Sequence, residues 1–329
     1  MPASELPKEL SEVSVVNITD PTAVHESIGL LDQDVVNLDQ EAFEIKRITV
    51  PLKDCCLLYQ SSNVALRTQT RVHKDFDACT ILGPRASASL NGRELHSLAL
   101  VVTGPGAQME VIVHSGYESV TWLVPPRILN EHLLLRGIKK YFVIPEHLEI
   151  WHPPVKIARD HFELGVRIVE AAENSPEIFN DNHWARYGAQ VEFMDSLFAM
   201  IESCEPDEHV ESDKKGISYS RIVRACEDYT SNLEGSRPYL SELCATANVS
   251  ERTLQYAFRD IMGMSPLTYL NRLRLHRARD ELRKARSSST TVTDVAMNWG
   301  FWHLGEFSRA YRNCFGELPS RTLKPNSDN

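Results

Sequence analysis

The 329-residue sequence has no run of eighteen apolar residues, which excludes a helix long enough to cross a membrane. Residues 1–13 are acidic and polar, and they lack the basic and apolar regions of a secretory signal peptide. We therefore expect a cytoplasmic protein with no membrane partner. The seven cysteines are an odd number and include no C-x-x-C pair, which disfavours a disulfide framework and a zinc site. We interpret the adjacent Cys55 and Cys56 as small apolar residues of a strand.

Motifs that support catalysis are also missing. The sequence has no G-x-S-x-G nucleophile elbow, no phosphate-binding loop and no H-E-x-x-H motif. His73, His96 and His114 stand singly, whereas a metal site needs several ligands that converge on one point. We therefore expect no catalytic residue, no metal ligand and no cofactor.

Charge is distributed unevenly along the chain. The net charge is −10, but residues 221–329 carry 16 basic and 12 acidic side chains, and the rest of the chain is strongly acidic. Residues 252–286 alone hold nine basic and three acidic side chains. A basic C-terminal third on an acidic body suggests a module that binds a polyanion, joined to a different kind of domain.

The N-terminal part predicts strands first and helices afterwards. Residues 43–124 alternate apolar and polar side chains, and Asn91-Gly92 is a strong hairpin signal between two such runs. Many short strands with frequent turns are typical of an antiparallel barrel or sandwich. After Pro125-Pro126 the period becomes helical as far as about residue 203. The expected class is thus α+β, with residues 1–203 as a barrel-like (cupin-like) domain with helices, 204–216 as a polar linker and 217–329 as an all-helical domain.

One of these helices carries a seam of large apolar residues. Its members are spaced 3, 4, 3, 4 and 3 apart, which resembles a heptad pattern. The seam is either a dimer interface between two chains or a core face packed on the strands, and we expect a homodimer through residues 1–203. The seam consists of Trp184, Tyr187, Val191, Met194, Phe198 and Ile201.

An internal repeat organises the C-terminal domain. Residues 240–270 and 292–323 match when one residue is inserted, with an apolar stripe, a glycine and a proline in the same order. Each unit predicts a short helix, a turn and a second helix. Ser250 is expected to cap the second helix of the first unit, and Thr291 or Thr293 the start of the second unit. Gly263 and Gly316 are expected to end the second helices.

Two helix-turn-helix units with a basic connector suit DNA, because the second helix of such a unit can lie in the major groove. A plain helical hairpin would pack equally well. The connector, residues 266–285, predicts a helix of about 19 residues and roughly 28 Å. One turn of DNA is about 34 Å, so this helix can place two recognition helices in successive major grooves. The basic connector is also expected to neutralise phosphates.

The C-terminal hundred residues resemble the DNA-binding domain of the AraC/XylS family of bacterial transcription regulators. The resemblance rests on LSELCATANVSERTLQYAFRDIMGMSPLTYLNRLRLHRARDEL in the first unit and on TVTDVAMNWGFWHLGEFSRAYRNCFGELP in the second. It implies an N-terminal domain that senses a small molecule and dimerises. It also implies double-stranded operator DNA and RNA polymerase as partners.

The expected DNA-binding residues lie at the start and on the outward face of each second helix. Arg can pair with guanine, Gln with adenine and Glu with cytosine, while Leu304 can contact a thymine methyl group. Trp302, in the second turn, is interpreted as a brace between the two helices of its unit. His303 is expected to cap the helix or to contact a phosphate. The predicted residues are Ser250, Glu251, Arg252, Thr253, Gln255, Tyr256, Arg259, His303, Leu304, Gly305, Glu306, Arg309 and Arg312.

These patterns predict a DNA-binding transcription regulator, an activator, controlled by its N-terminal sensing domain. Two alternatives belong to other classes of protein. One is a cupin-like enzyme, since barrels of this kind can hold metals. The other is an interaction protein or anti-activator that keeps the fold without binding DNA.

Overall fold

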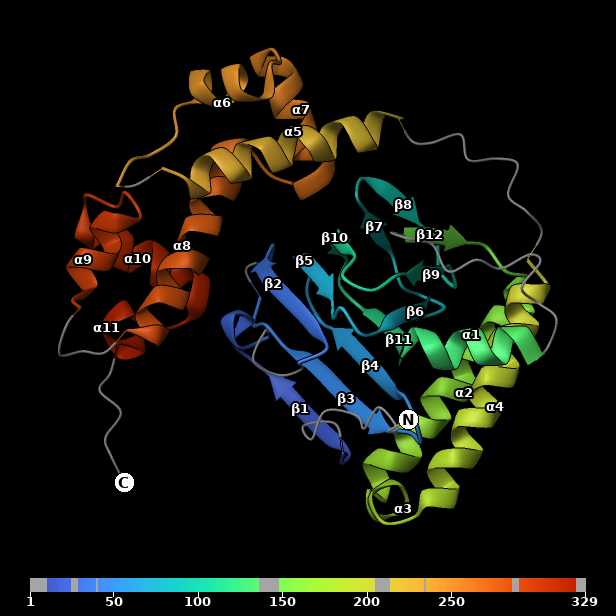
Figure 1. Cartoon of the computed structure of the whole chain (residues 1–329). Helices are drawn as coiled ribbons and strands as arrows, with labels where there is room; N and C mark the ends of the chain where they lie inside the picture. The colour runs from blue at the N-terminus through green and yellow to red at the C-terminus, as the bar shows by residue number, and fades with distance from the viewer. Residues whose placement is uncertain are drawn as a thin grey trace, which may run out of the picture.

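The computed structural model describes residues 11–24, 29–39, 41–135, 148–204, 214–233, 235–285 and 290–323. Two antiparallel sheets form the N-terminal part, and helices form the C-terminal part (Figure 1). This arrangement confirms the predicted α+β class. Among the described helices, none is both long and apolar enough to span a bilayer.

The larger sheet has seven strands in the order β1-β3-β4-β11-β6-β9-β12, and all of its neighbours pair antiparallel. Side chains alternate between its two faces, as the pleat requires. One face packs on helices and the other faces the second sheet. The strands are β1 (Ser14–Ile18), β3 (Ile45–Pro51), β4 (Cys56–Ser62), β11 (Tyr117–Val124), β6 (Asp77–Leu82), β9 (Leu100–Thr103) and β12 (Leu148–Trp151).

The smaller sheet has five strands in the order β2-β5-β10-β7-β8. Its hairpin between β7 and β8 confirms the predicted turn: Leu90 pairs with Arg93, and Asn91 and Gly92 have φ of 49° and 78°. The strands are β2 (Leu31–Asn37), β5 (Leu66–Val72), β10 (Gln108–Val113), β7 (Ala88–Leu90) and β8 (Arg93–Leu95), and the short 3-10 helix η2 (Pro21–Ala23) precedes β2.

The predicted strand region, 43–124, was too narrow. β1 and β2 precede it, and β12 lies within the segment expected to be helical. β2 reads LDQDVVN, so both faces carry polar side chains and the alternation that marks a half-buried strand is hidden. β12 has only four residues and is defined by its pairing with β9, which no local pattern encodes.

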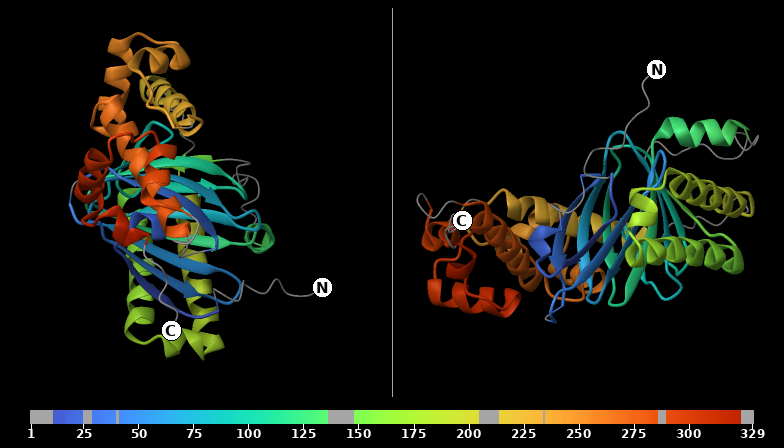
Figure 2. Two further views of the ribbon diagram at one scale, coloured as in Figure 1. Left: turned by 90° about the vertical axis from the view of Figure 1, so that its left-hand side faces the viewer. Right: turned by 90° about the horizontal axis from the view of Figure 1, so that it is seen from below.

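Helices cover the outer face of the seven-stranded sheet, opposite the five-stranded sheet (Figure 2). Trp122 of β11 lies fully buried there, and its ring meets Phe193 edge-on with centroids 6.4 Å apart. Such aromatic pairs add to the free energy gained by burial. These helices are α1 (Pro126–Leu135), α2 (Val155–Asn174), α3 (Glu177–Asn180) and α4 (His183–Glu202).

The seam on α4 divides into an exposed and a buried half. Met194, Phe198 and Ile201 are at most 4% exposed and belong to the core between α4 and the sheet, so the dimer assignment of these three is wrong. Val191 is half-buried, whereas Trp184 and Tyr187 are exposed. The 3-4 spacing requires only that a helix face be covered, and here the sheet of the same chain covers the half that holds Met194, Phe198 and Ile201.

The C-terminal helices form two successive cores. The first lies among α5, α6, α7 and the start of α8, and the second among the rest of α8 and the last helices. Of the predicted linker, residues 205–213 lie outside the described residues, and residues 214–216 begin α5. The helices are α5 (Lys214–Ser231), α6 (Leu240–Ala247), α7 (Glu251–Met262), α8 (Pro266–Lys284), α9 (Val292–Asn298), α10 (Leu304–Phe315) and α11 (Pro319–Thr322).

Candidate nucleic-acid interface

Backbone hydrogen bonds confirm the internal repeat. The N–H of Val249 donates to the carbonyl of Cys244 at 3.0 Å, and the N–H of Phe301 donates to that of Ala296 at 2.8 Å. Asn248 and Gly300, which precede the two donors, both adopt the left-handed conformation, with φ of 52° and 69°. Both first helices therefore end in the same glycine-type cap.

The predicted helix ends are largely confirmed. Ser250 caps α7 by accepting from the N–H of Thr253 at 3.2 Å, and Thr291 caps α9. Gly263 and Gly316 follow α7 and α10 with φ of 69° and 75°. These caps fix where each recognition helix begins and ends, and so which side chains stand in its first turn.

His303 occupies the N-cap position of α10, but its side chain makes no capping hydrogen bond. The capping role considered for it is therefore wrong, and the residue is exposed. Contact with a phosphate remains a prediction.

Burial separates two faces on each recognition helix. Leu254 and Phe258 of α7 and Phe307 and Tyr311 of α10 are at most 1% exposed and hold the helices on their cores. The opposite faces are open to solvent, and only Thr253 and Gln255 among the predicted residues are half-buried. The exposed ones are Ser250, Glu251, Arg252, Tyr256, Arg259, His303, Leu304, Gly305, Glu306, Arg309 and Arg312.

On α7, Arg252 is already ordered by its neighbour. Its Nη2 donates to the hydroxyl of Tyr256 at 3.1 Å, and its guanidinium lies 5.3 Å from the centre of the Tyr256 ring. A planar guanidinium held on an aromatic face loses less conformational entropy when it binds a planar partner. Arg252 is therefore positioned for bidentate hydrogen bonding at the start of α7.

α8 holds the two units together, as the sequence predicted, and its 19 residues match the expected length. Tyr269 and Leu273 pack in the first core, whereas Ala278 and Leu282 pack in the second. Because both cores share one helix, α7 and α10 are held at a fixed separation along it.

The turn of the second unit is held by α8 as well. Arg274 donates from Nε to the carbonyl of Trp299 at 2.7 Å and lies 4.4 Å from the ring centre of Phe301. Burial lowers the pKa of Arg274 to about 10. Glu281 accepts from the indole N–H of Trp299 at 2.6 Å. These contacts brace the second unit.

The bracing role predicted for Trp302 is wrong, since Trp302 is 61% exposed. Phe301 and Trp299, which precede it, pack against the core of the unit instead.

The basic face of α8 contacts the N-terminal domain, so its arginines do not form a free phosphate-binding surface. Arg277 binds Asp34 at 2.5 Å, and Arg272 donates to the carbonyls of Asn37 and Asp39 at 3.1 and 3.2 Å. The expectation that the connector neutralises phosphates therefore stays a prediction. Sequence reasoning missed these contacts because a basic helix face looks the same whether it meets DNA or an acidic domain.

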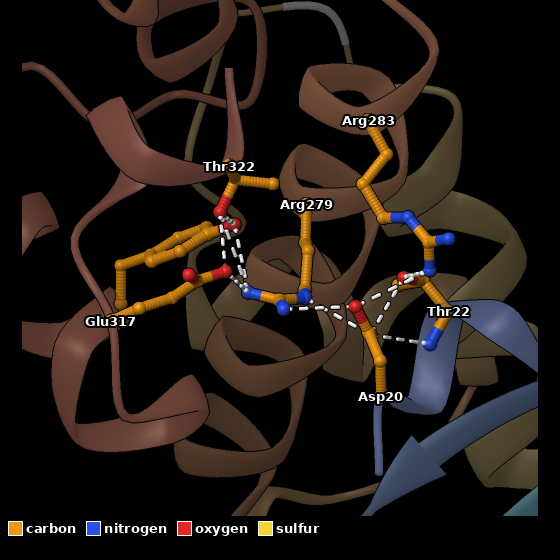
Figure 3. Close-up of polar contacts among 7 residues, drawn as sticks. Asp20, Thr22, Arg279, Arg283, Glu317 and Thr322 are labelled. Atoms are coloured by element: carbon orange, nitrogen blue, oxygen red, sulfur yellow. Dashed lines mark hydrogen bonds and ion pairs between the residues drawn. The ribbon is translucent and has the colours of Figure 1, made fainter. Parts of the chain in front are cut away.

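Arg279 links three parts of the molecule (Figure 3). It binds Asp20 through two hydrogen bonds of 3.0 and 2.9 Å, and it reaches Glu317 at 2.9 Å on its other side. Arg283 also contacts Asp20, at 3.2 Å. Burial alone would raise the pKa of Asp20, but the hydrogen bonds from Arg279 and Thr22 outweigh it and hold that pKa below its usual value.

A second interdomain contact is a fully buried charge cluster. Arg67 of β5 binds Glu110 of β10 at 3.3 Å and Glu227 of α5, and the hydroxyl of Tyr269 donates to Glu227. Ser220 donates to Glu110 at 2.9 Å. One cation thus serves two carboxylates, and burial raises the pKa of Glu227 to about 7. The cluster lies between the outer face of the smaller sheet and the helices α5 and α8.

A cavity of about 80 Å³ lies between the facing sides of the two sheets. Its wall combines apolar side chains such as Val101 and Met109 with hydroxyl and amide groups such as Thr70, Thr80 and Gln60. A cavity of this volume can hold a small molecule of several non-hydrogen atoms, since a single water needs roughly 10–15 Å³. Within the described residues, no cluster of His, Cys, Asp or Glu has the arrangement of a metal site.

Comparison with known proteins first assigns a class to the C-terminal region. Residues 243–325 match a family described as a helix-turn-helix domain. The probable thc operon regulatory protein of Rhodococcus erythropolis is 34% identical over 103 residues, which cover 31% of each chain. The XylDLEGF operon transcriptional activator 3 of Pseudomonas putida is 36% identical over 107 residues, covering 32% of this chain and 31% of that one.

A solved structure of a probable AraC family transcriptional regulator from Rhodopseudomonas palustris is 37% identical, covers 31% of this chain and 94% of that one, and has a TM-score of 0.29. Residues 243–325 therefore form a helix-turn-helix domain of the kind found in AraC/XylS-type regulators. The alignments span about a third of the length of the two regulators named first.

Proposed function

We propose that this protein is a sequence-specific DNA-binding regulator of transcription, an activator that contacts RNA polymerase. The observation that carries the proposal is the pair of recognition helices, α7 and α10. Each buries one apolar stripe, leaves its polar face to solvent, and shares α8 as a common support. The XylDLEGF relatives are named as transcriptional activators, which supports the direction of the effect.

The chemistry of the two exposed faces differs. α7 offers Arg252 and Gln255, which suit guanine and adenine in the major groove. α10 offers Glu306 and Arg309, which suit cytosine and guanine. Four polar side chains on two helices allow recognition of two short sequences about one helical turn apart on one side of the duplex.

We predict that Arg252→Ala weakens binding to the preferred operator by about 1–3 kcal/mol and relaxes the base preference at one or two positions, because the bidentate contact is lost. Arg309→Ala should have the same effect at base pairs roughly one helical turn of the DNA away. The measurement is a gel-shift titration of the full chain against an operator selected from random duplexes, followed by a base-substitution scan with each variant.

Arg127→Ala is the matched control, since Arg127 is an exposed arginine of α1 that pairs only with Glu131 among the described residues. It should leave the affinity and the base scan unchanged. Uniform losses at every base position in the Arg252 and Arg309 variants would refute direct base reading. A full chain that selects no duplex at all would support the interaction protein instead.

We propose in addition that the protein acts as a homodimer. We further propose that the cavity between the sheets binds a small-molecule effector. Residues on the inner faces of β2, β5 and β10 line the cavity, and residues on their outer faces contact α5 and α8. Thr68 and Thr70 of β5 line the cavity, for example, while Arg67 of the same strand lies on the opposite face and binds Glu227 of α5. A ligand that shifts these strands would therefore act directly on the helices that carry the DNA-binding units.

An effector found by thermal-shift screening of the full chain is expected to lose its stabilising shift in Ala88→Phe. Ala88 is fully buried in the cavity wall, and the added ring occupies the cavity. Leu134→Phe on the exposed face of α1 serves as the control and should retain the shift. An effector that stabilises Ala88→Phe as much as the native chain binds elsewhere.

A further inference from the structure

The second helix-turn-helix unit contains one residue that the first lacks, and the structure identifies it as Trp302. The caps at Val249 and Phe301 are equivalent, because they close on Cys244 and Ala296. In the first unit, the next residue after Val249 is the N-cap of the recognition helix α7. In the second unit, Trp302 stands between Phe301 and the N-cap of α10.

The inserted side chain is free of the core. Val249 and Phe301 both pack against their hydrophobic clusters, whereas Trp302 is 61% exposed. In the described part of the chain, no atom accepts a hydrogen bond from its indole N–H. An exposed tryptophan combines a large apolar surface with a donor that usually finds a partner when it is buried.

The backbone of the insertion is fixed rather than loose. Arg274 binds the carbonyl of Trp299, and a Cβ on Gly300 would lie 2.5 Å from the carbonyl oxygen of Ser236. Trp299 and Gly300, which shortly precede Trp302, are therefore held by α8 and by the segment before α6. The indole is thus presented from a rigid turn at the N-terminal end of α10.

We propose that Trp302 contacts the sugar-phosphate backbone at the edge of the groove that α10 enters, an inference that rests on the proposed DNA-binding function. The N-terminal end of a recognition helix enters the groove, so a residue just ahead of its N-cap faces the strand that borders the groove. The ring packs on deoxyribose, and the indole N–H donates to a phosphate oxygen. The contact positions α10 and carries no base information.

The test compares the affinities of the full-length protein and its variants for a selected operator and for a mixed-sequence duplex, measured by fluorescence anisotropy. Trp302→Ala should weaken binding to both duplexes about tenfold, as expected for one lost hydrogen bond with its packing. Trp302→Phe should recover part of this loss, because it keeps the ring and lacks the N–H. Neither variant should change the thermal midpoint or the dependence of affinity on salt, since the side chain is exposed and uncharged.

Leu134→Ala removes an exposed apolar side chain of α1 and is the control. DNA should also protect a tryptophan from acrylamide quenching in the native chain and not in Trp302→Phe. Equal affinities of the native chain and Trp302→Ala would overturn the inference while leaving the proposed function intact. If Trp302→Ala loses affinity for the operator but not for the mixed-sequence duplex, Trp302 reads bases instead of contacting the backbone. If Trp302→Ala binds DNA normally but transcription is reduced, Trp302 contacts the polymerase instead. Failure of the native chain to bind either duplex would overturn the proposed function as well.

Discussion

Replacing Arg67 by methionine will lower the free energy of unfolding of the full chain by roughly 3–5 kcal/mol. Arg67, Glu110 and Glu227 are each at most 3% exposed, and the guanidinium is the cation that the two carboxylates share. Methionine fills a similar volume but leaves both carboxylates buried without a counter-charge. Chemical denaturation followed by circular dichroism measures the loss.

Arg71→Met is the matched control for this substitution. Arg71 lies on the same strand and the same face, four residues further on, and is exposed. Its replacement should change the free energy of unfolding by less than about 0.5 kcal/mol. Adding Glu227→Gln to Arg67→Met should restore part of the stability, since one unpaired carboxylate is removed. Similar stability of the Arg67 and Arg71 variants would contradict the importance of the cluster.

Asp77→Asn will raise the free energy of unfolding relative to that of the native chain, and this difference will grow as the pH rises. Asp77 of β6 is fully buried, and neither carboxyl oxygen has a hydrogen-bond partner among the described residues. Burial raises the pKa of Asp77 to about 7, from an ordinary value of 3.8. Between these two values the folded chain keeps a proton that the unfolded chain has lost, so stability falls as the pH rises.

The measurement is the free energy of unfolding of both proteins at pH 5 and pH 8. The difference between Asp77→Asn and the native chain should grow by on the order of 3 kcal/mol over this interval, because the native carboxyl must ionise inside the protein. Asp75→Asn, at an exposed position two residues earlier, should follow the native chain. A constant difference across the interval would show that Asp77 ionises normally.

Local chemistry explains which parts of the fold were predictable from the sequence. The helix ends at Ser250, Gly263, Thr291 and Gly316 depend on neighbouring residues only, so the sequence predicted them correctly. The same holds for the two apolar stripes and for α8, whose spacing and flanking residues mark a helix on their own.

Features that depend on a distant partner were not predictable. The spacing of Met194 and Phe198 indicates a covered face, but only the tertiary structure shows that the sheet covers it. The charge of Arg277 and Arg279 indicates an anionic partner, and the partners are Asp34 and Asp20, more than two hundred residues away in the chain. No pattern in the sequence links such pairs.

The two faces of β2, β5 and β10 impose a thermodynamic constraint on regulation. One face lines the cavity and the other contacts α5 and α8, which support the two recognition helices. Under the proposed function, occupancy of the cavity and binding of DNA therefore share one coupling free energy. Whatever factor an effector applies to the affinity for DNA, DNA must apply the same factor to the affinity for the effector. Protein bound at a promoter and protein free in solution would therefore respond to different concentrations of the same molecule.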